Sequence, residues 1–510
     1  MHQRPSFTLT RADLLRRGLL GLVGAVAAGR LFVDDAANAA PLPSPVIRVR
    51  DVQLGARSRD LATRSSPFNL LGLHWLGSGK VWFRTSDGEH WSQWQRAVVH
   101  ELADVGEGVS GDWQLGTPVW LGGSGATEIE YRVEGDVRAL RAHEVWSPVG
   151  AEPRRLAIAP TPFIVPRASW GADESIVRAT PSSVDRLLFA VVHHTAGKRP
   201  ATPAESAAQV RGIQRYHTLS NGWNDIGYNF LVDGFGQVFE GRGGGLDRNV
   251  IGAHALGFNT GSTGVAVLGN FEKDAPGPEV ESVLVQLLAW RLDVGHVDPL
   301  ALVSTVSTTG ATRTLRGISG HRDTGATACP GRNLYPLLDG LAQQVAGVGL
   351  PKLYDATSEG ASSRLVRFTG RLSTPLPWTV TVAGPDGVAV AQGAGAGTAI
   401  DWSWDATAAT DGRYTWSMQA SGNVLPASGA VSVGAVATPP ASPAQPRPPR
   451  PAGVPRRIPS WAWRLRAWHR LPKAQRGPRP QGTPRRPPSW YWPWFRWTGA
   501  VERWQRSQRP

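Results

Sequence analysis

The sequence predicts a multidomain chain in which a central α/β domain, a mixed β-sheet with flanking helices, lies between two β-rich domains. The chain has 510 residues, more than one hydrophobic core usually holds. Residues 160–348 alternate buried apolar runs with helical periods, whereas both flanks show period-two alternation and Gly-rich turns. With 41% hydrophobic and 18% charged residues, the composition excludes a wholly disordered chain and a multi-span membrane protein.

Residues 1–39 have the pattern of an export signal. Arg16 and Arg17 precede the uncharged apolar stretch 18–28, which is too short to span a bilayer, and small residues at 37–39 form a cleavage pattern. The paired arginines favour a twin-arginine signal; an ordinary secretory signal is the alternative. We therefore expect a secreted or cell-wall protein without a stable membrane span after signal removal.

Residues 45–150 are expected to form a β-sandwich-like domain. Leu71, Leu73 and Trp75 alternate with Gly72 and His74, and further Trp residues follow in short strand-like runs. These Trp side chains are interpreted as core residues in preference to a carbohydrate-binding surface. The pattern gives no other indication of chemistry in this domain.

The central domain, residues 160–348, is expected to contain buried strands, a hairpin and three helices. Asp233-Gly234 is the turn of the hairpin. The expected strands are 186–192, 228–232, 237–240 and 264–268, and the expected helices are 202–217, 280–292 and 333–346.

Two segments follow the central domain. Residues 351–436 return to alternating strands with a strong turn at 384–387, which predicts an immunoglobulin-like β domain. Residues 437–510 are rich in Pro, Arg and Trp, and so many prolines are expected to prevent a packed core and leave a disordered tail.

The net charge of +14 belongs to this tail. Between 446 and 510 there are 15 Arg and one Lys against Glu502 alone, so this segment carries +15 and residues 1–445 carry −1. The charge therefore says nothing about the partner of the folded part, for which we expect no nucleic acid. Arg with interleaved Trp suits an anionic wall polymer; the alternative is that the tail is not a selected binding element.

One set of residues suggests metal chemistry. His193 and His194 directly follow a buried strand, and His321 precedes Cys329, the one cysteine of the chain, by eight residues. Two His and one Cys would give Zn²⁺ three protein ligands and leave the fourth position to water. Spacing alone leaves open a chance pairing of histidines and an unremarkable buried cysteine.

The same region resembles a known family. Five stretches occur in the order found in peptidoglycan recognition proteins and zinc-dependent N-acetylmuramoyl-L-alanine amidases, in particular those that actinobacteria export. They are RASWGADES (167–175), VVHHTAG (191–197), YHT with NGWNDIGYNFLVDGFGQVFEGR (216–242), IGAHALGFNTGSTGVAVLGNF (251–271) and GHRDTGATACPG (320–331).

The resemblance implies a set of site residues. His193, His321 and Cys329 correspond to the ligands of one Zn²⁺ ion, and family members that only bind peptidoglycan typically lack that Cys. Tyr228 corresponds to a catalytic position that helps to place the water or the substrate carbonyl, and Thr327 corresponds to a second catalytic position, which holds Thr in many members and Lys in others. His194 is interpreted as a structural neighbour. Four further residues are expected to line the peptide groove: Trp223, His254, Asn259 and Asn270.

The implied reaction is hydrolysis of the amide between N-acetylmuramic acid and L-alanine in peptidoglycan, with the glycan strand and the stem peptide as partners. Zinc would lower the pKa of its water from about 15.7 to about 7. Hydroxyl donors would then stabilise the charge that develops on the carbonyl oxygen. The alternatives are a non-catalytic peptidoglycan-binding protein and a wall-anchored protein.

Overall fold

The structure is a computed structural model that describes residues 44–54, 61–99, 113–153, 162–308, 310–360 and 364–434, and short stretches between 455 and 498. The chain divides into two compact units, 1–434 and 435–510, which are treated separately. The expected signal, residues 1–39, lies outside the described residues. Among the described residues, no helix is long and apolar enough to cross a membrane.

The described residues between 46 and 146 form two antiparallel sheets. The first has the order β1-β9-β3-β6, with β7 paired to β3, and the second has the order β2-β8-β4-β5. Apolar residues of both sheets, among them Leu73, Val81 and Ile129, share one core. The strands are β1 (Val46–Val52), β2 (Leu61–Phe68), β3 (Leu70–Leu76), β4 (Lys80–Ser86), β5 (Gln95–Arg96), β6 (Trp113–Leu115), β7 (Val119–Trp120), β8 (Ala126–Glu134) and β9 (Ala139–Trp146).

Strand β3 is buried on both faces, although its alternating sequence suggested one polar face. Leu71 and Leu73 face the core between the two sheets. On the other side, a Cβ at Gly72 would lie 2.0 Å from the ring of Tyr216, so only glycine fits there. Tyr216 belongs to the central domain, and the two regions therefore pack closely against each other.

The central domain is built on a six-stranded mixed sheet, order β10-β14-β13-β16-β12-β19, which confirms the expected α/β class. The strands β13, β16, β12 and β19 are parallel, and β13 and β14 form the antiparallel hairpin predicted from Asp233-Gly234. The sheet strands are β10 (Ile164–Val165), β12 (Phe189–His194), β13 (Phe230–Val232), β14 (Val238–Glu240), β16 (Ser262–Val267) and β19 (Ile318–Gly320).

The long helices begin at the signals in the sequence. Helix α4 (Pro203–Leu219) starts after Thr202, whose side chain accepts a hydrogen bond from the Glu205 backbone N–H, and α5 (Pro278–Val294) starts with Pro at its first position. The helix expected over 333–346 is shorter. Its first part is a 3-10 turn, η3 (Tyr335–Leu337), and α7 (Leu338–Gly347) follows, since Pro336 lacks the N–H that an α-helix needs.

Several short elements complete the domain. They are α3 (Arg167–Trp170), η2 (Glu174–Ile176), β11 (Ser183–Val184), β15 (Asn249–Val250), β17 (Leu302–Val306), β18 (Thr312–Arg316) and α6 (His321–Thr324). Strand β11 pairs with β15, and β17 pairs with β18.

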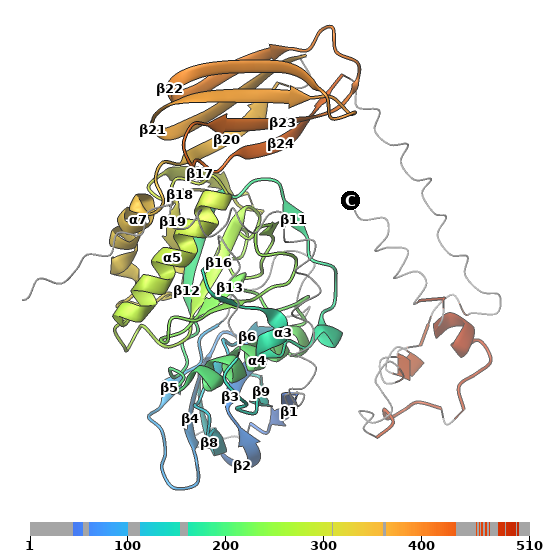
Figure 1. The fold of residues 1–510 in the computed structure, drawn as a ribbon. Helices are drawn as coiled ribbons and strands as arrows, with labels where there is room; N and C mark the ends of the chain where they lie inside the picture. The colour runs from blue at the N-terminus through green and yellow to red at the C-terminus, as the bar shows by residue number, and fades with distance from the viewer. Residues whose placement is uncertain are drawn as a thin grey trace, which may run out of the picture. The chain divides into compact units, whose positions relative to one another are not determined.

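The helices cover both faces of the central sheet. In β13, Phe230 and Val232 share a core with α5 and α7, whereas Leu231 shares a core with α4. The core on the α4 side continues into the N-terminal sheet through Leu70, Trp120 and Val145, and Figure 1 shows α4 beside β3, β6 and β9. The sequence pattern changes between the expected domains 45–150 and 160–348. In the structure, however, the N-terminal sheet packs directly on α4 of the central domain and shares a core with it.

Residues 353–433 form a five-stranded antiparallel sheet: β20 (Leu353–Glu359), β21 (Leu365–Ala383), β22 (Ala389–Asp405), β23 (Gly412–Ala420) and β24 (Ala427–Val433). An immunoglobulin-like domain would have two separate sheets, but here hydrogen bonds join all five strands. The register of β21 with β22 shifts between Arg371 and Leu376. Strand β20 pairs with the half of β21 before this shift and β23 with the half after it, and both halves contribute to one core.

The second unit, 435–510, is described only in part. Four of its described residues, Ala462, Leu465, Tyr491 and Trp494, are buried against one another. For these residues the expectation that proline prevents a packed core does not hold, because large aromatic rings supply the apolar surface. The expected disorder of the remaining tail concerns residues outside the described set.

Candidate metal centre

Three of the predicted site residues converge at one edge of the central sheet. Strands β12 and β19 are parallel, with Val192 opposite Gly320. His193 and His321 directly follow these two residues and so come side by side, with ring centroids 4.4 Å apart. Parallel register thus brings together two histidines that are 128 positions apart in the sequence.

Cys329 reaches the same point from the loop after α6. Its carbonyl accepts a hydrogen bond from the Arg322 backbone N–H, and its Sγ accepts one from the His194 backbone N–H at 3.3 Å. Sγ lies 3.8 Å from Nδ1 of His193. These contacts fix the thiol beside the first histidine.

The geometry fits a single ion. The donor atoms of His193, His321 and Cys329 all lie within 4.8 Å of one another, and the three residues are buried. Around one zinc ion with Zn–N near 2.1 Å and Zn–S near 2.3 Å, tetrahedral donor atoms are roughly 3.4–3.7 Å apart. Two imidazole nitrogens and a sulfur are also the donor types that zinc prefers.

His193 has a hydrogen-bond partner on the side of its ring that faces away from Cys329. Its Nε2 lies 3.1 Å from Nδ1 of His254, while its Nδ1 faces the thiol. Burial lowers the pKa of His254 to about 3, with smaller contributions from His321 and Arg242, so His254 is neutral near pH 7. Metal-bound histidines commonly donate their other N–H to such an acceptor, which fixes the ring and its tautomer.

His321 is held through the start of its short helix. Asp323 accepts hydrogen bonds from the Gly320 backbone N–H, from the Arg316 guanidinium and, at 2.6 Å, from the Tyr335 hydroxyl. This hydrogen bond to a carboxylate raises the pKa of Tyr335. Asp323 thereby anchors the turn that presents His321.

The expected catalytic residues lie close to the three donors. The Tyr228 ring centroid is 5.4 Å from that of His193, and burial, followed by the charge of Cys329, raises the pKa of Tyr228, so its hydroxyl stays protonated. The Thr327 hydroxyl accepts a hydrogen bond from the Cys329 backbone N–H at 3.2 Å. Both hydroxyl groups retain a proton to donate.

His194 points to the opposite face of the sheet, as strand alternation requires. Its Nδ1 accepts a hydrogen bond from the Phe271 backbone N–H at 3.2 Å. Burial lowers the pKa of His194 to about 4. These contacts agree with the interpretation of His194 as a structural residue.

The residues expected to line the groove are placed differently. Asn259 is fully buried, and its Oδ1 accepts hydrogen bonds from two backbone N–H groups, those of His254 and Ala255. Trp223 is 1% exposed and packs on the ring of His217. His254 lies behind His193, and only Asn270 is partly exposed. The Asn259 side chain thus organises a loop and Trp223 is enclosed, and the groove assignment of the four residues stays a prediction.

The sequence reasoning missed the supporting role of two residues. Asp323 could have been found, because a carboxylate three positions after Gly320 is typical of a helix start. The contact of His254 with His193 could not, because it joins a loop residue to the end of strand β12 across 61 positions.

This chain is similar in sequence to known proteins of one family. A family described as N-acetylmuramoyl-L-alanine amidase matches residues 184–332. Peptidoglycan-recognition protein SC2 of Drosophila simulans is 37% identical over 172 residues, which are 34% of this chain and 82% of that protein. The N-acetylmuramoyl-L-alanine amidase of Homo sapiens is 37% identical over 182 residues, which are 35% of this chain and 28% of the human protein.

A solved structure also resembles this chain. The crystal structure of Drosophila peptidoglycan recognition protein SD is 32% identical, and the similarity covers 35% of this chain and 94% of that chain at a TM-score of 0.29. The relatives bear two kinds of name, recognition protein and amidase. Similarity alone therefore does not decide between binding and hydrolysis.

Proposed function

This chain belongs to the family of peptidoglycan-recognition proteins and N-acetylmuramoyl-L-alanine amidases, and on that premise we propose that it is a zinc-dependent N-acetylmuramoyl-L-alanine amidase. The proposed reaction is hydrolysis of the amide bond between the lactyl group of N-acetylmuramic acid and L-alanine in peptidoglycan. The observation that carries the proposal is the convergence of His193, His321 and Cys329 within 4.8 Å.

The proposed ligand set leaves room for catalysis. Three protein donors leave one position of a tetrahedral ion to water or substrate, as in catalytic rather than structural zinc sites. When bound, zinc would activate water as a nucleophile and polarise the amide carbonyl. The protein would keep this set rigid through the hydrogen bond of His193 to His254 and through the Asp323 turn that presents His321.

The neighbouring hydroxyl groups have a role in this proposal. As water attacks the carbonyl carbon, negative charge develops on the carbonyl oxygen, and the protonated hydroxyls of Tyr228 and Thr327 would donate hydrogen bonds to it. One such donor contributes about 3–4 kcal/mol at most to the transition state. The C–N bond then breaks, the alanine nitrogen takes up a proton, and the lactyl carboxylate is left on the glycan.

The alternative function is peptidoglycan binding without hydrolysis. It is favoured by the relatives that are named recognition proteins. The two functions differ in what Cys329 does: hydrolysis requires its thiolate at the metal, whereas a binding groove does not.

Export and wall retention are separate proposals. Residues 16–17 and 18–28 support export by a twin-arginine signal, and the +15 charge of residues 446–510 supports contact with an anionic wall polymer. A fragment that ends at residue 436 tests the second point: it should hydrolyse sacculi normally but should be retained at low salt more weakly than the full chain on walls that carry an anionic polymer.

The test of hydrolysis uses the purified full chain with peptidoglycan sacculi. We expect about one zinc per chain and release of stem peptides with a free alanine amino group, detected by mass spectrometry. Cys329→Ser should lose both zinc and release, whereas His90→Ala, at an exposed position, should lose neither. Full activity of the serine variant would refute the catalytic proposal, and zinc-free binding of sacculi without release would favour the alternative.

A further inference from the structure

We propose that the cleft between the central domain and the C-terminal β sheet is a second binding site, which takes a saccharide. Given the function proposed above, its ligand is a stretch of the peptidoglycan glycan strand. The existence of the site is argued from the cleft, and only the identity of the glycan rests on the proposed function. None of the residues that line the cleft belongs to the metal centre.

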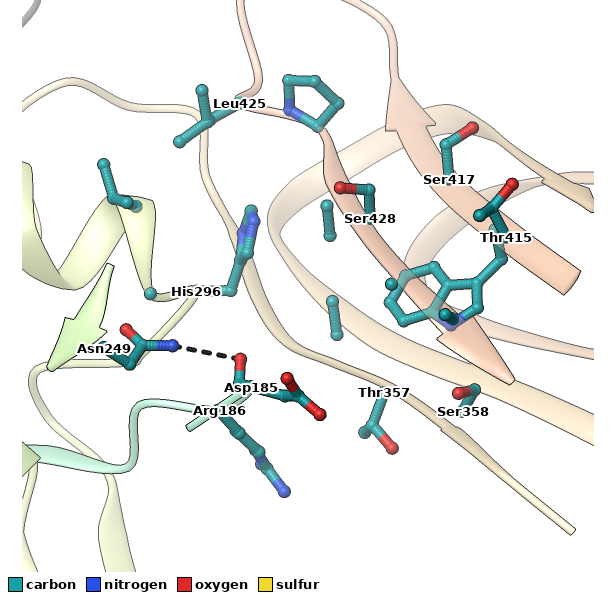
Figure 2. Close-up of a pocket in the computed structure, with 18 of the residues that line it drawn as sticks. Asp185, Arg186, Asn249, His296, Thr357, Ser358, Thr415, Ser417, Leu425 and Ser428 are labelled. Carbon is teal, nitrogen blue, oxygen red and sulfur yellow. Dashed lines mark hydrogen bonds between the residues drawn. The ribbon is translucent and has the colours of Figure 1, made fainter. Parts of the chain in front are cut away.

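The cleft is large. Its volume is about 1530 Å³, whereas pockets for single small ligands hold about 300–1,000 Å³. Figure 2 shows Asp185, Arg186, Asn249 and His296 of the central domain on one side and residues of the β sheet on the other. A polymer segment of several units matches this size better than one small molecule.

Short hydroxyl side chains are the commonest polar side chains of the β-sheet wall. Such side chains leave room for a ligand, and each can both donate and accept a hydrogen bond, as sugar hydroxyls do. A solvated sheet face usually carries long charged side chains instead. The hydroxyl residues of this wall are Thr357, Ser358, Thr381, Thr415, Ser417, Ser428 and Ser432.

The charges of the cleft nearly balance. Asp185, Asp247 and Asp355 face Arg186 and Arg413, and Arg186 lies 3.7 Å from Asp355 across the cleft. A polyanion such as nucleic acid needs a clear excess of basic residues, which is absent from this lining. A largely uncharged chain of hydroxyl groups is complementary to it.

Both sides of the cleft also offer apolar surface. Trp290 and Leu246 line the central-domain side and Leu425 the opposite side, and all three are partly exposed. Sugar rings have apolar C–H faces between their hydroxyl groups. Mixed apolar and hydroxyl walls are therefore the lining that a saccharide requires.

The junction at the base of the cleft is fixed by specific contacts. The Asp355 backbone N–H donates to the His296 carbonyl at 2.7 Å, and Nδ1–H of His296 donates to the Leu353 carbonyl at 3.1 Å. Asp298 pairs with Arg371 of the β sheet.

His296 and Asp355 both adopt positive φ, 54° and 53°. This conformation is unfavourable for residues other than glycine and is often found at functional sites. Because hydrogen bonds and an ion pair fix the junction between the two walls, the cleft needs little rearrangement to bind a ligand.

The experiment measures binding of a β-1,4-linked N-acetylglucosamine hexasaccharide to the full chain by calorimetry. This probe lacks the amide bond of the proposed reaction, so it reports binding only. Thr415→Trp places a bulky ring in the cleft and should weaken binding by roughly tenfold or more. Gln419→Trp, on the same exposed face of β23 but outside the cleft, should leave the affinity within about twofold.

The outcomes separate this proposal from the proposed function. If the hexasaccharide does not bind, or binds both tryptophan variants equally well, the cleft is not a saccharide site. That result would leave the amidase proposal standing, because the amidase proposal is tested separately on sacculi. If binding is lost only in Thr415→Trp while the wild-type chain fails to hydrolyse sacculi, the cleft proposal holds and the amidase proposal fails.

Discussion

Trp120 is the side chain through which the N-terminal sheet most directly stabilises the central domain. It is fully buried and shares a core with Val210 and Ile213 of helix α4. Its carbonyl also accepts a hydrogen bond from the Lys198 backbone N–H at 2.9 Å, in the loop that follows His193. Trp120→Ala should therefore destabilise the central domain, although the residue lies outside it in the sequence.

The expected magnitude follows from burial. Replacing a core Trp by Ala costs about 3–5 kcal/mol. The N-terminal sheet contributes Leu70, Trp120 and Val145 to this core, and burial of each such side chain contributes about 1.5–3 kcal/mol. Removing the sheet thus costs about 5–9 kcal/mol, comparable with the whole stability of a typical domain, about 5–15 kcal/mol. A fragment of residues 160–348 should fail to fold by itself.

Thermal and denaturant unfolding of the full chain, followed by circular dichroism, measures this effect. Trp120→Ala should lower the Tm by about 6–20 °C. The matched control is Trp113→Ala: Trp113 lies in the same sheet but is partly exposed, with the Arg141 guanidinium 4.6 Å from its ring, and its loss should cost at most about 1 kcal/mol. The reasoning is refuted if both variants unfold alike, or if residues 160–348 alone unfold cooperatively at the Tm of the full chain.

Three further predictions concern the metal centre and the domain contact. His254→Ala should weaken zinc binding by about 10–100-fold, because His193 loses its orienting partner; competition with a chelator measures this, and unchanged affinity would exclude the positioning role. Tyr228→Phe should keep zinc but slow stem-peptide release by about 10²–10³-fold, and an unchanged rate would remove Tyr228 from catalysis. Burial lowers the pKa of His74 to about 4 and of His143 to about 2, from 6.5, with nearby Arg141 adding to both shifts. These histidines take up protons only in the unfolded chain between pH 6.5 and 4, so stability should be constant above pH 6.5 and fall below it, by up to about 1.4 kcal/mol per pH unit for each histidine. Urea titrations from pH 4 to 8 test this. A double variant, His74→Gln with His143→Phe, should reduce the slope by the contribution of these two residues, while His194 and His254, whose pKa values burial also lowers, keep theirs.

Local patterns were sufficient to predict the long helices and four of the six sheet strands of the central domain, but not β10, β19 or the short elements. The apolar run before His193 became β12, the Asp233-Gly234 turn became the β13–β14 hairpin, and Pro278 marked the start of α5. These features depend on side-chain periodicity, proline and turn residues, which act over a few positions. The last helix was predicted too long, because proline at its second turn was not weighed against the apolar spacing around it.

Packing over long distances could not be predicted. The alternation in β3 suggested a polar face, yet His74 lies buried against the Tyr216 hydroxyl, with its Nε2 3.0 Å from the oxygen. Only the docking of α4 onto that sheet explains its burial. Likewise, the sequence contains every strand of the C-terminal sheet, but the pairing of both β20 and β23 with β21 follows from the bend in that strand.

The sequence by itself singled out the candidate ligands His193, His321 and Cys329: the strand-end histidines and the lone cysteine suggested them, and the resemblance to a known family selected them. The tertiary structure decided which groups hold those ligands in place: His254, the Asp323 turn and the N-terminal sheet behind α4. The physical reason is that ligand identity depends on the chemistry of single side chains. Their orientation instead depends on hydrogen bonds and packing between segments that meet only when the whole chain is folded.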